Sequence, residues 1–374
     1  MNSIFRNNDL ITGNEDLILI QSLPKFPVFL GCVDHDSAQD KFFDMNFYIS
    51  RSSGMIQLNP MLPLDVVYKD DHSQGSVGSA WSQHHIKFAE FIHRHSPRSV
   101  FEIGGAHGML CRAYSQIATV DWTIIEPNPV ASADTPAKII KGWFTDATSV
   151  PSGIDMIVHS HVLEHMYDPT DFFRNLSTLA PGVKTCFSVP NIKLHIEKKY
   201  TNAIQFEHTY SCIKEYIEYW LQRFGFNLID QEYYGEHSVF YSAIRTDRAE
   251  QDTPVPDLYH DNKKLMTDFF EYHRSRAITL NAELQKQSAY LFGAHVFSQY
   301  QLAFGLDASK IICLLDNSPQ KQNRRLYGTD LFVSSPKVLK DQINPVVILH
   351  AGQYSEEIKK DIIDNINPTT IFLE

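Results

Sequence analysis

Short apolar segments alternate with amphipathic segments from residue 81 to residue 247, and this alternation constrains the fold more than any other feature of the chain. SVFEIG, DWTIIEP, DMIVHS and TCFSVP have the length of buried strands, whereas WSQHHIKFAEFIHRH, MLCRAYSQI, DPTDFFRNLSTL and IKEYIEYWLQRFG have helical spacing. Strands that alternate with helices predict a doubly wound, largely parallel α/β sheet. The closing strands, FNLIDQEY and SVFYSAIR, are joined by GEH and are expected to be antiparallel.

The 374 residues exceed one ordinary domain, and the pattern divides them into four parts. Residues 1–80 form an irregular module with short strand-like runs such as FPVFL and NFYIS. Residues 81–247 form the α/β domain, and residues 248–287 a linker and a long helix. A second, smaller alternation at 288–374 predicts another Rossmann-like domain.

Composition excludes several classes of function. No apolar run approaches the roughly 20 residues that cross a bilayer, so no membrane partner is expected. The N-terminus lacks the basic and apolar regions of a signal peptide. The five scattered cysteines are typical of reduced thiols in a cytoplasmic protein. A net charge of -11 argues against nucleic acid as a partner.

The strand SVFEIG leads into the loop GGAHG at 104–108, and a helix follows at once. Such loops let the backbone approach a ligand and present helix N-terminal amides to it. The dinucleotide spacing G-x-G-x-x-G is absent, because Ala106 and Met109 stand at the second and third glycine positions. Glu102 precedes the loop, and its carboxylate suits the positively charged methionine end of S-adenosylmethionine (SAM) better than a pyrophosphate.

Two further segments follow strands of the same sheet. Glu126 closes the next strand, where an acid can accept hydrogen bonds from both ribose hydroxyls; a solvated surface glutamate is the alternative. The fourth strand runs into HSHVLEH at 159–165, which is expected to face the site at the carboxyl ends of the strands. His159, His161 and His165 could instead ligate a metal, since the first two share a strand face. A structural role for His165 is also open.

EIGGAHG, IIEPNP, the VLEH segment and VPN resemble the successive motifs of class I SAM-dependent methyltransferases over residues 81–247. The resemblance implies an enzyme with SAM as its cofactor. It also implies that Trp143 and Phe144, in KGWFTDA, flank the adenine. The other cofactor-binding residues that we expect are Glu102, Gly104, Gly105, Ala106, Gly108, Glu126, His159 and His161.

The whole layout is similar to the C-methyltransferases that act on nucleotide-linked keto-deoxysugars, which have an N-terminal zinc module, a SAM domain and a Rossmann-like C-terminal domain. LFGAHVFSQYQLAFGLD, LLDNSPQKQNRRLYGTDLFVSSPKVL and VVILHAGQYSEEI carry the C-terminal resemblance. It implies a nucleotide diphosphate site in that domain, at the turn of Gly293 and His295, with Lys321, Arg324 and Arg325 nearby. Alternatively, the C-terminal domain binds no nucleotide and only packs against the rest of the chain.

The zinc module of that family departs most from this sequence. Its two C-x-x-C pairs appear here as Asp9/Thr12 and Ser50/Ser53. Hydroxyl oxygens do not replace thiolates on zinc, so no metal site is expected. Cys32 and His35 offer two ligands, which do not complete a structural site.

The active loop departs as well. The family has Tyr-His-Glu-His where this chain has Gln205-Phe206-Glu207-His208. C-methylation of a keto sugar needs a base that removes the proton next to the carbonyl; His208 suits this role, and Glu207 can orient it. The phenols of Tyr68 and Tyr210 are candidate donors to the enolate oxygen, and His165 completes the candidate catalytic set.

Two other functions stay open. A histidine base serves equally for O-methylation of a sugar or natural-product hydroxyl, since the same proton transfer activates either acceptor. A non-catalytic SAM-binding scaffold is the third possibility, although retention of the acids and histidines in both halves of the site argues against it.

Overall fold

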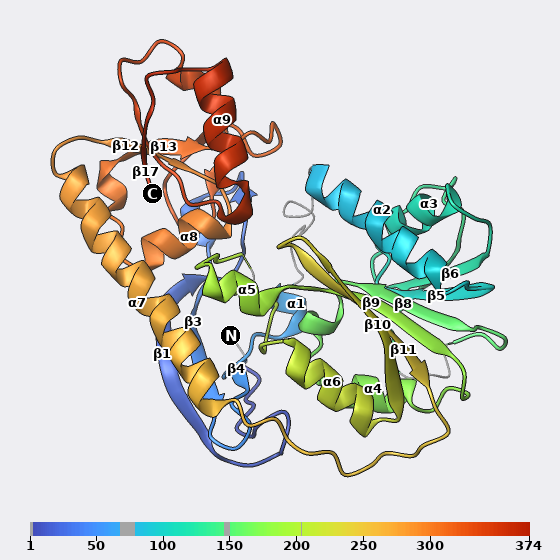
Figure 1. Ribbon diagram of the computed structural model, residues 1–374. Coiled ribbons are helices and arrows are strands. Elements are labelled where there is room, and N and C mark those ends of the chain that lie inside the picture. Colours follow the sequence, from blue (N-terminus) through green and yellow to red (C-terminus); the bar gives the residue numbers. More distant parts are fainter. Residues whose placement is uncertain (1–2, 68–78, 146–149, 203) are drawn as a thin grey trace.

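The structure, a computed structural model, describes residues 3–67, 79–145, 150–202 and 204–374. Sheets of three, seven and five strands and one two-stranded pair organise these residues (Figure 1). The three-stranded sheet lies near the start of the chain, the seven-stranded sheet in its middle and the five-stranded sheet near its end. In the described part of the chain, no helix is both long and apolar enough to cross a bilayer.

The central sheet has the strand order β10-β11-β9-β8-β5-β6-β7. Its strands are β5 (Ser99–Ile103), β6 (Asp121–Glu126), β7 (Lys138–Lys141), β8 (Met156–Ser160), β9 (Lys184–Pro190), β10 (Phe226–Tyr234) and β11 (Ser238–Arg245). The pairs from β7 to β9 are parallel, whereas β11 is antiparallel to both β9 and β10. The chain therefore has the Rossmann-like α/β fold and the antiparallel end that its sequence predicts.

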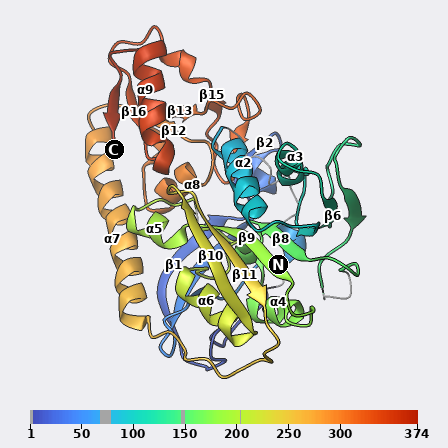
Figure 2. The same cartoon turned by 45° about the vertical axis from the view of Figure 1, so that its right-hand side comes forward.

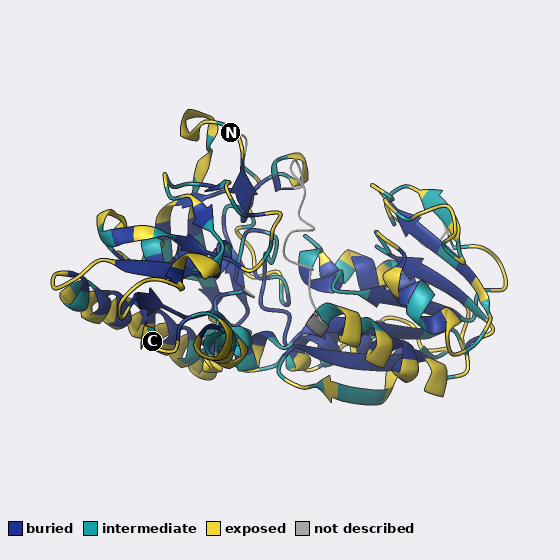
Figure 3. Ribbon diagram, turned by 90° about the horizontal axis from the view of Figure 1, so that it is seen from above, coloured by how far each residue is buried: buried dark blue, intermediate teal, exposed yellow. Residues whose placement is uncertain are grey.

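Helices cover both faces of this sheet. They are α2 (Ser79–Arg94), α3 (Met109–Ser115), α4 (Pro169–Leu176), α5 (Ile192–Glu197) and α6 (Lys214–Arg223). Figure 1 shows α2 and α3 on one face and α4 and α6 on the other. Seen from above, the sheet is buried between helices whose outer faces are exposed (Figure 3). All the predicted helices of this domain are present, and α5 is an additional short one.

The N-terminal module is more regular than its sequence suggested. It contains β1 (Leu17–Pro27), β3 (Phe42–Ser50), β4 (Ile56–Leu58) and the short helix α1 (Leu64–Val67). The strand order is β1-β3-β4, and all pairs are antiparallel. The run NFYIS lies in β3 as expected, but FPVFL was the wrong choice, because β1 ends at Pro27. Pro24 is tolerated within β1 because the pairing is irregular between Leu23 and Phe26.

The four residues compared above with the cysteines of a zinc module, Asp9, Thr12, Ser50 and Ser53, are linked by hydrogen bonds. The hydroxyl of Ser53 donates to Oδ1 of Asp9 over 2.9 Å, and the hydroxyl of Thr12 donates to Oδ2 of the same carboxylate over 2.7 Å. The hydroxyl of Ser50 accepts the backbone N–H of Ser53 over 3.2 Å. Direct hydrogen bonds thus join side chains at positions that the family fills with thiolates.

The C-terminal domain is a five-stranded parallel sheet in the order β15-β13-β12-β16-β17. Its strands are β12 (Ala289–Phe292), β13 (Ile311–Leu315), β15 (Val333–Ser334), β16 (Val346–Ile348) and β17 (Ile371–Leu373), and its helices are α8 (Val296–Ala303) and α9 (Ser355–Asn365). The strand–helix alternation predicted at 288–374 is therefore present.

Two connections fix this domain to the rest of the chain. The helix α7 (Tyr259–Leu284) runs along the N-terminal sheet and reaches the C-terminal domain (Figures 1 and 2). The strand β14 (Arg325–Leu326) pairs with β2 (Cys32–Val33). Beside this pair, the buried guanidinium of Arg325 forms an ion pair of 2.6 Å with Asp40, and Arg324 forms one of 3.0 Å with Asp34. These two ion pairs join the C-terminal domain to the N-terminal module, and neither arginine is among the described residues that line the cavity.

Candidate functional site

One cavity of about 1340 Å³ extends from the carboxyl ends of the central strands to the C-terminal domain. The central domain contributes the glycine loop after β5, the segment after β8 and the loop at 202–208. The C-terminal domain contributes the turn after β12, the segment after β13 and α9. A ligand in this cavity therefore contacts both Rossmann-like domains.

The glycine loop between β5 and α3 is tightly packed from behind. Gly104 has a φ of +77°, and a Cβ there would lie 2.6 Å from the side chain of Val162. A Cβ at Gly105 would lie 2.6 Å from the side chain of Ile124. Gly108 has a φ of +68° and is the N-cap of α3. These contacts explain why glycine is needed here, and Gly104, Gly105 and Ala106 line the cavity as expected.

Glu102 is a buried acid that lines the cavity beside this loop. Its Oε2 accepts a hydrogen bond of 2.7 Å from the indole nitrogen of Trp122. Burial raises the pKa of Glu102 to about 7; the Trp122 hydrogen bond opposes this rise, and the charge of Glu126 adds to it. An arriving cation would stabilise the ionised form of Glu102, which suits the methionine end of SAM.

Glu126, at the end of β6, holds the glycine loop in place. Its Oε2 accepts the amide N–H of Ala106 over 3.1 Å, and its Oε1 accepts that of Asn128 over 2.9 Å. The side chain is largely buried and is not among the described residues that line the cavity. Each oxygen keeps a second lone pair, so the carboxylate retains the capacity to accept the predicted bonds from a ribose.

Four other predicted cofactor residues, Gly108, Trp143, Phe144 and His159, lie elsewhere. The ring of His159 is fully buried and stacks on Phe187 with centroids 4.9 Å apart. Since β8 ends at Ser160 and His161 has a φ of +53°, His159 and His161 do not share a face as we expected. Phe144 packs against the core at Phe101 and Phe172, and Trp143 is exposed after β7. None of these four is among the described residues that line the cavity, whereas His161 is.

The acidic and basic side chains after β8 meet those of the loop at 202–208. Nδ1 of His165 lies 3.5 Å from Oε2 of Glu207, and the rings of His165 and His208 are 4.8 Å apart. The amide of Gln205 lies 3.2 Å from Nε2 of His208. The predicted residues His165, Glu207 and His208 therefore come together in the cavity wall. Glu207 also pairs with His165, whereas the sequence suggested His208 as its partner.

Glu164 connects this group to a second set of histidines. Its carboxylate is fully buried, with Oε1 3.1 Å from Nδ1 of His161 and 4.0 Å from Nε2 of His165. Burial opposes ionisation, but the hydrogen bond with His161 and the nearby histidines outweigh it and lower the pKa of Glu164 to about 2. The carboxylate is thus ionised at neutral pH. The sequence analysis did not select Glu164, although it stands in the VLEH segment.

One of the two candidate phenols, Tyr210, is not among the described residues that line the cavity. Tyr210 is buried in the core, where its hydroxyl donates to the carbonyl of Leu163 over 2.6 Å and its ring contacts Trp220. Its selection as a donor to substrate was wrong, because packing buries the ring and the carbonyl of Leu163 takes the hydroxyl proton. Tyr68 lies outside the described residues.

The C-terminal wall of the cavity is built around the turn after β12. Gly293 has a φ of +101°, His295 precedes α8, and both line the cavity. Asp316, just after β13, accepts the amide N–H of Ala294 over 3.1 Å and that of Ser318 over 2.9 Å. Lys321 forms an ion pair of 3.1 Å with Asp316 and also lines the cavity. Sequence analysis had found Lys321 but not Asp316.

Comparison with known proteins agrees with this geometry. A family model described as a methyltransferase domain matches residues 79–231. None of the curated proteins has a significantly similar sequence. Among solved structures, the magnesium protoporphyrin IX methyltransferase of Synechocystis PCC 6803 is similar with a TM-score of 0.36 and 14% identity, covering 47% of this chain and 89% of that one.

Two further solved structures are similar over the same part of the fold. A SAM-dependent methyltransferase from Mesorhizobium loti has a TM-score of 0.34 and 14% identity, covering 45% of this chain and 99% of that one. The N,N-8-amino-8-demethyl-D-riboflavin dimethyltransferase of Streptomyces davawensis has a TM-score of 0.36 and 13% identity, covering 49% and 64%.

Proposed function

We propose that this class I SAM-dependent methyltransferase transfers a methyl group to the carbon beside the keto group of a nucleotide-linked keto-deoxysugar. The nucleotide lies against the C-terminal domain, and the sugar reaches the His165–Glu207–His208 group. SAM lies at the glycine loop of the central domain. The cavity that both domains line accommodates this arrangement.

One observation carries the proposal: the C-terminal domain repeats the acid-and-amide arrangement of the SAM site. Asp316 follows the second strand of its sheet as Glu126 ends the second strand of the central sheet. Each carboxylate accepts one amide from the loop after the first strand over 3.1 Å, and one from two residues beyond the acid over 2.9 Å. An acid in this place binds ribose hydroxyls in Rossmann-like folds, so the repeat supports a second nucleoside site.

The remaining features of the C-terminal wall suit a diphosphate. The start of α8, where Val296 and Phe297 line the cavity, is a helix N-terminus of the kind that stabilises an anion. Lys321 supplies a positive charge, part of which Asp316 already neutralises. A cavity of about 1340 Å³ also exceeds the roughly 300–1,000 Å³ of a single small-ligand site, as two ligands require.

In the proposed reaction, His208 removes the proton from the carbon next to the carbonyl. The resulting enolate carbon attacks the methyl group of SAM. The bond from sulfur to this methyl group breaks, and S-adenosylhomocysteine is the leaving group. The pair of His165 and Glu207 positions His208 and stabilises the charge that it gains, since the two rings are in contact. Gln205 and Asn202, which line the cavity, offer amide N–H donors for the enolate oxygen.

O-methylation of a hydroxyl is the second candidate. The same histidines can remove a hydroxyl proton, and Tyr210, a phenol that would favour an enolate, is committed to Leu163. The two reactions differ in one observable step, because C-methylation must break a C–H bond before the methyl group moves.

The experiment combines a panel of nucleotide-linked keto sugars with SAM and follows the products by mass spectrometry. We expect a mass increase of one methyl group with at least one member of the panel. In heavy water, with S-adenosylhomocysteine in place of SAM, the same substrate should exchange the hydrogen next to its carbonyl. Methylation without this hydrogen exchange would show that the reaction is O-methylation and not C-methylation. If no member of the panel is methylated, the proposed substrate class is wrong.

A further inference from the structure

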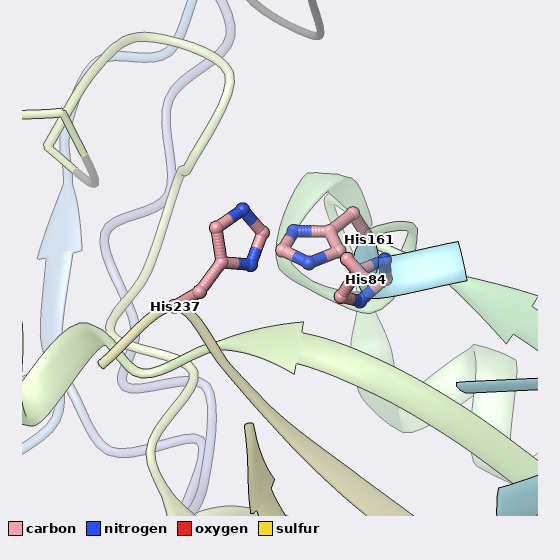
Figure 4. Close-up of side chains that lie close together, drawn as sticks. All are labelled: His84, His161 and His237. Carbon is pink, nitrogen blue, oxygen red and sulfur yellow. The ribbon is translucent and has the colours of Figure 1, made fainter. Parts of the chain in front are cut away.

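Three histidines from distant parts of the chain converge beside the cavity (Figure 4). His84 comes from α2, His161 follows β8, and His237 lies in the turn between β10 and β11. One ring nitrogen of each lies within 4.8 Å of the others. His84 and His237 are buried, and His161 and His237 line the cavity. We propose that these imidazoles bind a divalent transition-metal ion of the zinc class, with one coordination position open toward the cavity.

Each ring is held by an oxygen on one of its two nitrogens. Nε2 of His84 lies 2.8 Å from the hydroxyl of Ser188, and Nδ1 of His237 lies 2.5 Å from that of Ser238. Nδ1 of His161 lies 3.1 Å from the buried carboxylate of Glu164. Metal-binding histidines almost always carry such a partner on the nitrogen that does not bind the ion. The carboxylate on His161 is the form of this contact that most increases ligand basicity.

The second nitrogen of each ring is then the ligand. Nδ1 of His84 is buried and has no hydrogen-bond partner in the described part of the chain, which is costly unless a ligand uses it. Nε2 of His161 contacts the hydroxyl of Ser238 over 2.9 Å, a bond that an ion would replace. Nε2 of His237 remains as the third ligand.

The spacing is close to what an ion requires. Zinc–nitrogen bonds of about 2.0–2.1 Å in a tetrahedral site place the nitrogens about 3.4 Å apart. One ring nitrogen of each histidine already lies within 4.8 Å of the others, so an ion would draw the rings somewhat closer together. Three neutral nitrogens and an open position correspond to a catalytic rather than a structural zinc site.

A second group, Glu164, His165 and His208, has equally close ligand atoms. It is the weaker candidate, because Glu164 is already paired with His161 and the two histidines belong to the proposed base. The sequence analysis expected no metal, and its alternative set of His159, His161 and His165 is excluded by the burial of His159 in the core. His84 and His237 lie far from His161 in sequence, so the spacing of histidines along the chain does not predict this metal site.

The ion would contact an oxygen of the acceptor and polarise it, as a Lewis acid does. This role rests on the proposed function, whereas metal binding itself does not. The two claims fail separately: an ion may be bound without methylation of any keto sugar, and methylation may proceed without an ion.

The test is a titration of the full chain, freed of metal by chelation, with Co²⁺, whose visible absorption reports four-coordinate nitrogen ligation. We expect about one Co²⁺ per chain, displaced by Zn²⁺. His84→Asn and His237→Asn should each weaken binding by at least about tenfold. The buried His273 in α7 provides the matched control, and His273→Asn should bind Co²⁺ like the unmodified chain.

SAM affinity, measured by calorimetry, identifies variants that fail to fold, and His237→Asn in an inter-strand turn is the safer of the two. His208→Asn separates the competing group, since it should leave Co²⁺ binding intact. No Co²⁺ bound to the unmodified chain would overturn the proposal. So would binding that survives both His84→Asn and His237→Asn, or that is lost in His208→Asn alone.

Discussion

The indole of Trp122 donates a 2.7 Å hydrogen bond to the buried carboxyl group of Glu102. Burial raises the pKa of this group to about 7 despite that bond. The acid at the predicted methionine end of the SAM site is therefore half protonated near neutral pH. Because SAM is positively charged and would favour the ionised form, its binding should be coupled to loss of this proton.

SAM affinity should accordingly rise with pH. Below about pH 7 the carboxyl must release a proton to bind the cation, so the dissociation constant should fall by up to about tenfold per pH unit and level off above pH 7. Calorimetry from pH 6 to pH 8 measures this, and proton release appears as a heat that depends on the buffer. In Glu102→Gln the affinity should be lower and independent of pH.

Stability without SAM should show the opposite trend. A folded-state pKa of about 7 lies above the ordinary value of 4.5, so the contribution of Glu102 is fully present below pH 4.5 and is lost as pH rises through about 7. Urea unfolding of the unmodified chain and of Glu102→Gln should therefore diverge between these two pH values, with the variant gaining relative stability. Parallel curves would show that Glu102 keeps an ordinary pKa.

Glu126 and Asp316 should divide ligand binding between the two domains. Glu126→Ala removes bonds to a ribose, each worth about 1.5–3 kcal/mol when charge-assisted, so SAM affinity should fall at least about tenfold. Asp316→Ala should leave SAM affinity unchanged and weaken binding of a nucleoside diphosphate. Calorimetry measures the affinity of each variant for SAM and for the nucleoside diphosphate. An Asp316→Ala chain that binds nucleoside diphosphate normally would remove Asp316 from the nucleotide site.

The parts of the site that follow from the sequence are local ones. Glu102, Gly104 and Glu126 stand at strand ends, and their positions follow once the strands are identified. His165, Glu207 and His208 came together because both of their segments follow strands of the same sheet. The assumption that His159 and His161 share a strand face was wrong, because β8 ends at Ser160 and His161 has a left-handed φ. His159, inside β8, faces the core.

The parts that the sequence could not supply depend on contacts between distant segments. In the sequence, Arg324 and Arg325 resemble phosphate ligands. In the structure they form ion pairs with Asp34 and Asp40 of the N-terminal module. His84, His161 and His237 are brought together by the packing of α2 against the central sheet and by one hairpin turn. Asp316 would have been found by applying to the second domain the strand-end rule that located Glu126.

The carboxylate of Asp9 should be important for the stability of the N-terminal module. It accepts hydrogen bonds from the hydroxyls of Thr12 and Ser53 and from the amides of Ile11 and Thr12. Asp9→Ala leaves buried donors without partners, at about 1–3 kcal/mol each, so we expect a loss of several kcal/mol in urea unfolding. The exposed Asp36, which caps a short 3₁₀ turn, is the control; Asp36→Ala should cost about 1 kcal/mol or less.

His208 should be indispensable for proton removal. His208→Asn keeps the shape of the side chain and loses its basicity, so methylation should fall by roughly 10²–10⁴. If the reaction is C-methylation, hydrogen exchange in heavy water should fall by the same factor, because both depend on the same proton transfer. His165→Asn should reduce both rates less, since His165 acts through its contact with His208. The control is His350→Asn, which should keep full activity, because His350 is a half-buried histidine bonded to the carbonyl of Lys199 and is not among the described residues that line the cavity. Full activity in His208→Asn would assign the base to another residue, and a larger loss in His165→Asn would make His165, with its Glu207 partner 3.5 Å away, the first choice.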